Sequence, residues 1–412
     1  MQSPRDALIV GGGVAGSTCA ILLAQAGWAV TLVEKQAFPR RKVCGECIAA
    51  SNLDLIDALG IGEAFRAIAG PPLRRVAWCA GDTTIETGLP PLLGSSQPWG
   101  RALGREHLDT LLRDRARALG ATIAQPCTVR SVHKIGDRHR CTVADAAAVE
   151  YTLDTDVVID AHGSWQRSPF ADRLPPRRAR RSDLFAFKAT FSSAHLTAEV
   201  LPVLAFAGGY GGMVQGDHGL LTLACCVRRD RLHQWRAQHP GVAAGEAVQQ
   251  LLVREIAAVR KALAGAQREG PWLAVGPIQP RLRRVRRIAG LFAVGNAAAE
   301  AHPILGEGIS MAMQSAFLLC ERLVADESSA SAQYATAWRH AFAWRIRLAA
   351  LYAHIAMRPL ATRAALPLLR RWPGLLSVGA QLGGKTVCAV DANVHFAFGT
   401  KGFSSAGNRA ST

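Results

Sequence analysis

The sequence predicts an α/β protein with three parts: a three-layer, Rossmann-like domain on a parallel sheet, an inserted β-sheet domain, and a C-terminal helical segment. Three observations support this arrangement. Short apolar runs at 7–10 and 30–33 flank an apolar helical pattern at 14–26. Strand patterns recur between 184 and 227, and a helical run rich in Arg, Leu and Ala follows from 334 to 378, broken at prolines.

A glycine cluster directly follows the first apolar run. Gly11, Gly13 and Gly16 fit G-x-G-x-x-G between a predicted strand and a predicted helix. The first glycine permits the tight turn, the second lets the backbone approach a pyrophosphate, and the third lets helix and strand pack closely. Glu34 ends the second apolar run, where a carboxylate would accept hydrogen bonds from a ribose. We therefore expect dinucleotide binding; the simpler alternative, a glycine-rich turn in an ordinary α/β unit, leaves Glu34 unexplained.

The remaining elements of this domain follow in order. The charged stretch 35–47 contains Pro39 and reads as a loop leaving the nucleotide crevice. A helix is predicted from Arg105 to about Leu119, with Arg105 at its start. A buried-type strand at 157–161 precedes a turn at His162, for which a structural role is the more economical interpretation.

The rest of the chain differs in character. In the inserted region, strands are predicted at 184–191 and 220–227, and one long helix at 242–264. Glycines around Tyr210 would let a ligand approach the backbone closely. The domain limits predicted from these patterns are a discontinuous nucleotide-binding domain at 1–168 with 281–325, a substrate-binding sheet domain at 169–280, a helical region at 326–390, and a loosely ordered polar tail at 391–412.

Composition limits the function classes. The chain has 412 residues, of which 49% are hydrophobic and 19% charged, as in a globular enzyme. Its 48 Lys and Arg against 31 Asp and Glu give a net charge of +17 and a pI of about 10.1. The basic clusters match no nucleic-acid module, so no nucleic-acid partner is expected. A solvated basic face is the simplest interpretation of the charge.

The predicted location is the cytoplasm. No secretory signal precedes the first predicted strand, and no apolar stretch is long enough to predict a transmembrane helix. The 10 cysteines are scattered, and reduced thiols are expected. Cys44 and Cys47 form a C-x-x-C pair, but a single such pair is poor evidence for a metal, and no metal site is predicted.

Four separated segments together resemble the glutathione-reductase-type FAD-dependent oxidoreductases. The branch is the one that contains aromatic-ring monooxygenases, geranylgeranyl reductases and flavin halogenases. The segments are 11–34, 38–46, 105–111 and 295–308, and the resemblance covers about residues 1–325. It implies FAD as the cofactor, with Arg105 pairing with the pyrophosphate and the helix after Gly308 directed at the flavin. The residues it assigns to FAD are Gly11, Gly13, Val14, Ala15, Gly16, Glu34, Lys35, Arg40, Cys44, Arg105, Val129, Asn296, Gly308 and Ile309.

The chain departs from the family pattern at two positions. Asn296 replaces the usual aspartate that accepts from the ribitol; its amide carbonyl can still accept a hydrogen bond. His162 stands where the monooxygenases often carry aspartate, which leaves pyridine-nucleotide handling open. The halogenase motif Trp-x-Trp-x-x-Pro is absent from the sequence.

The resemblance favours a monooxygenase that hydroxylates a lipophilic aromatic or polyketide-like substrate through a flavin hydroperoxide, with NAD(P)H as electron donor. The alternative is a flavin-dependent reductase of isoprenoid or lipid double bonds, because Cys44-Gly45-Glu46 looks like the reductases. A dithiol relay through Cys44 and Cys47 is a third enzymatic interpretation, weakened by the lack of a second nucleotide motif.

The candidate catalytic residues are Cys44 and His302, and Tyr210 is the candidate substrate-binding residue. A histidine suits proton transfer near neutral pH, although a loop histidine that packs its turn is an equal alternative for His302. The corresponding alternative for Cys44 is that it is a small side chain packed in the protein, with no part in catalysis. Arginines among Leu and Trp in the C-terminal helices also suit peripheral contact with the inner face of a membrane; a helical cap on the fold is the plainer interpretation.

Overall fold

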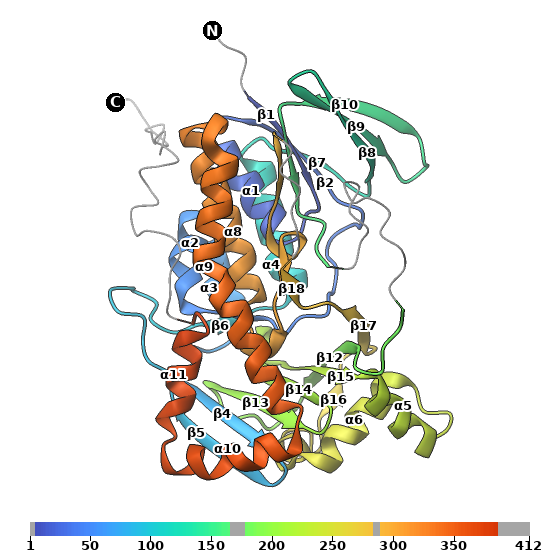
Figure 1. Ribbon diagram of the computed structural model, residues 1–412, viewed down its shortest axis with the longest axis vertical. Helices are drawn as coiled ribbons and strands as arrows, with labels where there is room; N and C mark the ends of the chain where they lie inside the picture. The colour runs from blue at the N-terminus through green and yellow to red at the C-terminus, as the bar shows by residue number, and fades with distance from the viewer. Residues whose placement is uncertain (1–4, 165–177, 283–288, 386–412) are drawn as a thin grey trace, which may run out of the picture.

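The computed structural model describes residues 5–164, 178–282 and 289–385. The predicted tail at 391–412 lies outside this range. Figure 1 shows two sheets at opposite ends of the molecule, joined by long helices that run between them.

The first sheet is parallel, with the strand order β19-β11-β1-β2-β7. Its strands are β1 (Asp6–Val10), β2 (Ala29–Val33), β7 (Thr122–Ala124), β11 (Val157–Asp160) and β19 (Leu291–Ala293). Alternate side chains of β1 enter different cores, because successive residues of a strand point to opposite faces. Ala7 and Ile9 pack on the helical layer, whereas Leu8 and Val10 pack toward a small antiparallel sheet.

These two layers complete the predicted three-layer domain. The helical layer contains α1 (Val14–Gln25), α4 (Arg105–Ala118) and α8 (Gly308–Ala325), with η1 (Ala50–Asn52), α2 (Leu53–Ala58) and α3 (Gly62–Ile68) beside them. The antiparallel layer consists of β8 (Thr128–Ile135), β9 (Arg138–Ala144) and β10 (Glu150–Thr155). The α/β fold class predicted from the sequence is confirmed.

The second sheet is mainly antiparallel and has the order β16-β12-β15-β14-β13-β4-β5, with β17 also paired to β12. Its strands are β4 (Arg75–Ala80), β5 (Thr83–Gly88), β12 (Leu184–Ser192), β13 (Val200–Phe206), β14 (Gly209–Gln215), β15 (Leu221–Arg228), β16 (Gln267–Arg268) and β17 (Leu273–Ile278). The sheet therefore extends beyond the range 169–280 assigned from the sequence. The reason is that β4 pairs in parallel with β13 and brings β5 with it.

Helices cover one face of this second sheet: α5 (Arg229–Gln238), α6 (Ala244–Glu255) and α7 (Ala257–Ala262). The single long helix predicted at 242–264 is wrong, because the chain breaks at Ile256, which has φ −130° and ψ 112°. Ala257 N donates 3.0 Å to the carbonyl of Gly81, a contact that fixes α7 against the β4–β5 turn. The opposite face of the sheet is turned toward the first domain.

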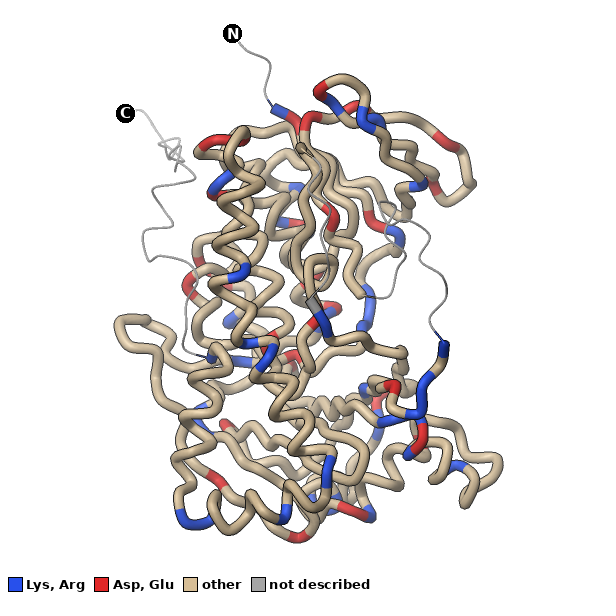
Figure 2. Tube along the Cα trace, in the orientation of Figure 1, with Lys and Arg blue, Asp and Glu red and all other residues tan. Residues whose placement is uncertain are grey.

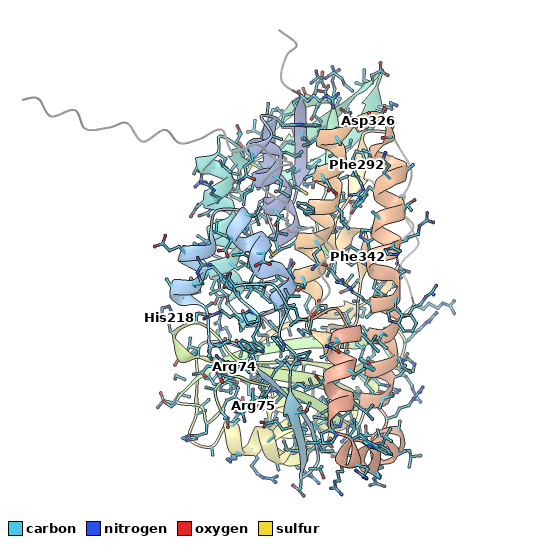
Figure 3. All side chains as sticks on the ribbon, turned by 90° about the vertical axis from the view of Figure 1, so that its left-hand side faces the viewer. Arg74, Arg75, His218, Phe292, Asp326 and Phe342 are labelled. Atoms are coloured by element: carbon cyan, nitrogen blue, oxygen red, sulfur yellow. The ribbon has the colours of Figure 1, made fainter. Side chains whose placement is uncertain are left out.

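The C-terminal helices connect the two ends of the molecule. They are α9 (Glu327–Ala356), α10 (Pro359–Arg371) and α11 (Gly374–Leu382). Asp326 caps α9 by accepting a hydrogen bond from Ser328 N at 3.0 Å, and Phe342 is fully buried further along the helix (Figure 3). Short elements complete the described chain: β3 (Cys47–Ile48), β6 (Arg101–Ala102), η2 (Asp217–Gly219), β18 (Arg281–Leu282), η3 (Gly295–Ala297), β20 (Ala299–Glu300) and η4 (Pro303–Leu305).

Candidate active site

The glycine turn after β1 has the packing expected from its spacing. Gly11 has φ +107°, which disfavours any residue with a side chain, and a Cβ there would lie 2.5 Å from the carbonyl oxygen of Ala161. A Cβ on Gly16 would lie 1.9 Å from the carbonyl oxygen of Gly11. A Cβ on Gly13 would instead meet only two guanidinium groups, those of Arg40 and Arg105, each at 3.7 Å. The space beside Gly13 is therefore bordered by two positively charged side chains.

Three cations gather at this turn, at the N-terminus of α1. Burial, followed by the charges of Arg105 and Arg40, lowers the pKa of Lys42 to about 8. Arg105 forms two 2.8 Å hydrogen bonds to Asp109, which hold its guanidinium in place. The first turn of α1 carries no acidic residue and no side-chain cap. Converging cations at an uncapped helix N-terminus are suited to an anion such as a pyrophosphate.

Glu34 lies where the sequence predicts a ribose ligand. Its carboxylate accepts from Gly12 N at 2.7 Å and from Gln36 N at 2.9 Å, and Arg40 lies 3.2 Å away. These contacts orient the carboxylate at the carboxyl end of β2, beside the glycine turn. The residues on this side of the site therefore fit the adenosine and pyrophosphate part of FAD.

The segment after β19 supplies the other side of the site. Gly295 has φ +57°, and its N–H donates to Ser315 at 2.9 Å. Asn296 donates to the hydroxyl of Ser164 at 2.7 Å, so its amide nitrogen is engaged and its carbonyl remains as an acceptor. The chain then turns at η4, and α8 starts at Gly308 with no acidic residue in its first turn. This N-terminus suits the electron-rich edge of a reduced flavin.

The loop 44–47 connects the dinucleotide side of the site to the second sheet. Glu46 is buried and has a left-handed φ of +58°. Its carboxylate accepts from the backbone N–H of Arg105 at 3.1 Å and from Thr222 at 2.6 Å, and it forms an ion pair with Lys188. Burial raises the pKa of Glu46, an effect that the charge of Lys188 opposes.

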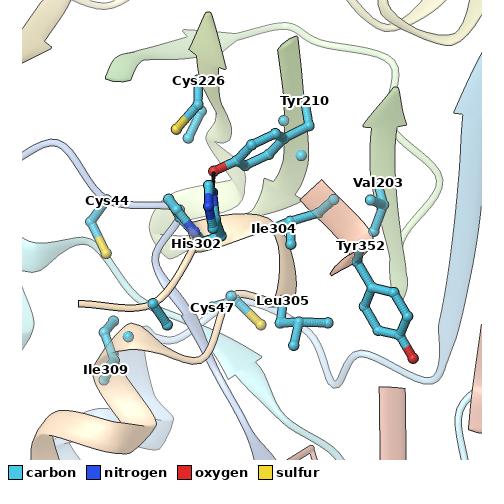
Figure 4. A pocket seen from close by; sticks show the side chains of 18 of the residues that line it. Cys44, Cys47, Val203, Tyr210, Cys226, His302, Ile304, Leu305, Ile309 and Tyr352 are labelled. Carbon is cyan, nitrogen blue, oxygen red and sulfur yellow. Dashed lines mark hydrogen bonds between the residues drawn. The ribbon is translucent and has the colours of Figure 1, made fainter. Parts of the chain in front are cut away.

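A continuous cavity of about 500 Å³ runs between the two sheets. One end is formed by Gly13, Arg105 and Asn296, and the other by the face of β4, β13 and β14 that is turned toward the first domain. Much of its lining is apolar, including Val76, Trp78 and Leu376. Val203, Ile304 and Leu305 belong to the same apolar lining and are labelled in Figure 4. Such a lining is typical of sites for lipophilic ligands.

Tyr210 and His302 form a polar pair within this apolar lining. The hydroxyl of Tyr210 lies 3.0 Å from Nδ1 of His302, and the two rings meet edge to face at 6.0 Å (Figure 4). Burial, assisted by His354, lowers the pKa of His302 to about 4. Burial also raises the pKa of Tyr210 well above its usual value. Both groups are therefore neutral near pH 7.

A second polar group on the cavity wall was not found from the sequence. Lys385 donates to Sγ of Cys47 at 3.3 Å and lies 3.3 Å from Glu307. Burial raises the pKa of the Cys47 thiol, although Lys385 opposes the effect. Lys385 follows the last described helix, and no motif around it indicates that it returns to the cavity. The sequence did not single out Lys42 or Lys188 either, and it named Glu46 only as part of Cys44-Gly45-Glu46.

The structure brings most of the predicted site residues together. Those that line the cavity are Gly13, Val14, Ala15, Cys44, Arg105, Tyr210, Asn296, His302, Gly308 and Ile309. Gly11, Gly16, Glu34 and Arg40 support the glycine turn from beside the cavity. Lys35 is exposed, and Val129 lies in the core beneath the antiparallel layer. Nδ1 of His162 forms a hydrogen bond with the carboxylate of Asp160 at the end of β11.

The structure also places His107, Asp217 and His218 together, with ligating atoms within 4.8 Å of one another. Asp217 accepts from Gly104 N at 2.8 Å and lies 3.2 Å from His107 Nε2, so it ties the start of α4 to the second sheet. His218 has φ +53° and is labelled in Figure 3. The sequence did not single out this group, which lies apart from the cavity lining.

Comparison with known proteins identifies the family. A family profile described as "FAD binding domain" matches residues 5–348. The chain belongs to this FAD-binding family. Within the described residues, none of the helices combines the length and apolarity needed to cross a bilayer.

Two curated relatives show the range of reactions around this chain. It is 26% identical over 382 residues to a tryptophan 2-halogenase of Chondromyces crocatus, which covers 85% of this chain and 69% of that protein. It is also 26% identical over 182 residues to a menaquinone reductase of Mycobacterium tuberculosis, which covers 44% of this chain and 43% of that protein. The chain therefore belongs to a family of flavin-dependent enzymes, and its relatives include a halogenase and a reductase.

Solved structures show the same fold. The myxobacterial chondrochloren halogenase CndH has a TM-score of 0.73 at 19% identity, with 96% of this chain and 97% of that chain covered. PqsL of Pseudomonas aeruginosa, described as a probable FAD-dependent monooxygenase, has a TM-score of 0.68 at 19% identity, with 91% and 100% covered. At these identities the likeness shows the fold alone.

Proposed function

We propose that this protein is an FAD-dependent monooxygenase that hydroxylates a lipophilic aromatic or polyketide-like substrate, with NAD(P)H as electron donor. The observation that carries the proposal is the cavity itself. It leads from the cation-lined glycine turn to an apolar chamber in which Tyr210 and His302 form a neutral pair. An apolar chamber with few polar groups suits an aromatic ring that carries a hydroxyl or carbonyl group.

The residues around the glycine turn are the proposed cofactor ligands. Arg40, Lys42 and Arg105 would hold the pyrophosphate, Glu34 a ribose, and Asn296 with the first turn of α8 the ribitol and flavin side. Bound there, FAD would pass two electrons from NAD(P)H to dioxygen, so that one oxygen atom enters the substrate and the other leaves as water. The apolar walls would keep bulk water away from this reaction.

The Tyr210–His302 pair would position the substrate and move a proton. His302 is unprotonated near neutral pH, since its pKa is about 4. Nδ1 can therefore accept from the hydroxyl of Tyr210, which leaves Nε2–H as a donor toward the chamber. A phenolic substrate that donates its hydrogen bond to the Tyr210 oxygen would gain electron density at the ring as its proton moves toward Tyr210, which in turn passes its own proton to Nδ1 of His302. That polarisation favours attack by an electrophilic oxygen.

Two other reactions have specific support. Cys44 lines the cavity, as does Arg105, and one relative is a menaquinone reductase. These two observations favour reduction of a lipid double bond as the alternative reaction. The more extensive match to a tryptophan 2-halogenase supports halogenation, although the sequence lacks the motif Trp-x-Trp-x-x-Pro.

One experiment separates these reactions. The purified protein is supplied with FAD, NAD(P)H, dioxygen and chloride, together with a panel of phenols, quinones and prenyl lipids, and the products are analysed by mass spectrometry. The proposal requires gain of one oxygen atom, labelled when the gas is isotopically heavy dioxygen. Gain of two hydrogens without oxygen would establish the reductase, and replacement of hydrogen by chlorine the halogenase; either result as the sole reaction overturns the monooxygenase.

A further inference from the structure

The last two described helices leave a large part of their apolar surface uncovered. None of the residues of α11 is buried, although its sequence is almost entirely apolar. Across α10 and α11 the exposed apolar side chains are Leu360, Leu368, Trp372, Leu375, Val378 and Leu382, with exposures from 42% to 79%. We refer to these six side chains as the α10–α11 surface. A helix that is apolar on all sides is normally covered on all sides, by protein or by lipid.

The helices α10 and α11 themselves carry charge of one sign only. Arg358, Arg363, Arg370 and Arg371 are exposed on or beside α10. From residue 328 to Lys385 the sequence contains no Asp or Glu at all. Figure 2 shows basic positions along these C-terminal helices. Arginines that flank apolar side chains on one face are the pattern of a helix lying in the interface of an anionic membrane.

The inner side of the same helices forms a wall of the cavity. Ala365, Leu369, Leu376 and Ala380 line the chamber that contains Tyr210. The wall is thin, because Leu368 and Leu375 line the cavity and are also substantially exposed. The apolar chamber and the exposed apolar surface are therefore separated by little more than one layer of side chains.

We propose that the α10–α11 surface docks on an anionic lipid surface. A second copy of this chain is a poor occupant, because two identical arginine-flanked surfaces would repel each other in a face-to-face dimer. An anionic lipid surface satisfies both the arginines and the apolar side chains. If the proposed function holds, a lipophilic substrate would pass from the lipid into the chamber through this wall.

The direct test is vesicle co-sedimentation of the full-length protein. Phosphatidylcholine vesicles are compared with vesicles containing equal parts of phosphatidylcholine and phosphatidylglycerol. The wild type should partition strongly into the anionic vesicles only. The double variant Arg363→Glu/Arg371→Glu should reduce the partition coefficient about tenfold or more, because each basic residue near the surface contributes about 1 kcal/mol. The double variant Leu360→Ser/Trp372→Ser should reduce the fraction that stays bound at high salt.

Matched controls exclude a general effect of the protein's positive charge. Arg130→Glu/Arg339→Glu makes the same charge change at exposed positions away from the surface. Ile135→Ser/Val149→Ser removes two exposed apolar side chains in the segment 128–155, which lies at the opposite end of the molecule (Figure 1). Both controls should bind anionic vesicles as the wild type does.

Two outcomes overturn the proposal. One is loss of vesicle binding in the charge control equal to that in Arg363→Glu/Arg371→Glu, which would reduce the effect to net charge. The other is absence of wild-type binding to the anionic vesicles. If the protein then dimerises with increasing concentration and Leu360→Ser/Trp372→Ser abolishes the dimer, the surface belongs to a second copy. Flavin content, measured on the same samples, is independent of both results and reports separately on the proposed function.

Discussion

The buried pair formed by Lys188 and Glu46 allows a quantitative prediction. Lys188 and Glu46 are 1% and 2% exposed, and Glu46 also accepts from Thr222 and from the backbone of Arg105. Removing one partner of a buried ion pair costs about 3–5 kcal/mol, because the other charge remains desolvated. Two hydrogen bonds to Glu46 survive in Lys188→Met, so we expect a loss near the lower limit, about 3 kcal/mol.

The loss should depend on pH in a defined direction. Burial raises the pKa of Glu46, and the charge of Lys188 opposes this effect. Without Lys188 the folded-state pKa rises further above the unfolded value. When the pKa of a carboxyl group is higher in the folded than in the unfolded state, the folded protein keeps its full stability at pH values below the unfolded pKa. That stability is lost as the pH rises through the folded-state pKa, because the buried group must then ionise. The destabilisation of Lys188→Met should therefore be smaller at about pH 5 than at about pH 8.

Urea unfolding of the two proteins at both pH values measures this difference. The matched control is Lys261→Met, which makes the same change at an exposed position on α7 and should alter the free energy of unfolding by less than about 0.5 kcal/mol. A loss for Lys188→Met below about 1 kcal/mol at both pH values would refute the reasoning. So would a loss of the same size at both.

Three further predictions concern the cofactor and the cavity. Affinity for FAD should fall as the pH rises above about 8, because Lys42 loses its proton there. Lys42→Met should bind FAD more weakly, but its affinity should not change with pH in this range. Fluorescence titration of each protein with FAD measures these affinities. Tyr210→Phe and His302→Gln should each lower the rate of product formation by at least about tenfold and leave the affinity for FAD unchanged. Steady-state kinetics measures the rate, and titration with FAD measures the affinity. An unchanged rate would show that the pair takes no part in the mechanism. Gly16→Ala should lose FAD and destabilise the fold by about 1–3 kcal/mol, because its Cβ would lie 1.9 Å from the carbonyl oxygen of Gly11. The control Gly88→Ala has open space around its Cβ and should retain FAD. The absorption spectrum of each purified variant measures bound FAD.

Local chemistry made the dinucleotide side of the site predictable from the sequence. The glycine spacing, the apolar runs and Glu34 lie within one continuous segment, and their contacts are short in sequence. The helix start at Arg105 was predicted for the same reason, since it depends on a local change of pattern. A second helix was expected directly after Gly308, and α8 begins at Gly308 itself. The resemblance then joined these segments around one cofactor.

The parts that were missed depend on contacts between remote segments. Pairing of β4 with β13 joins residues more than a hundred positions apart, and the apolar pattern of β4 does not specify its partner. Lys188 lies in a strand pattern that does not distinguish a buried ion pair from an exposed lysine. Lys385 reaches Cys47 only because α9, α10 and α11 fold back over the cavity. The break at Ile256 likewise follows from a contact with the β4–β5 turn.

The central claim is that these remote segments together bind FAD. The most direct measurement is the visible absorption spectrum of the purified protein, followed by titration of flavin-free protein with FAD. The account predicts the flavin absorption bands in the isolated protein, or their saturable change at one FAD per chain after removal and re-addition. A colourless protein that shows no spectral or fluorescence change when FAD is added would contradict it.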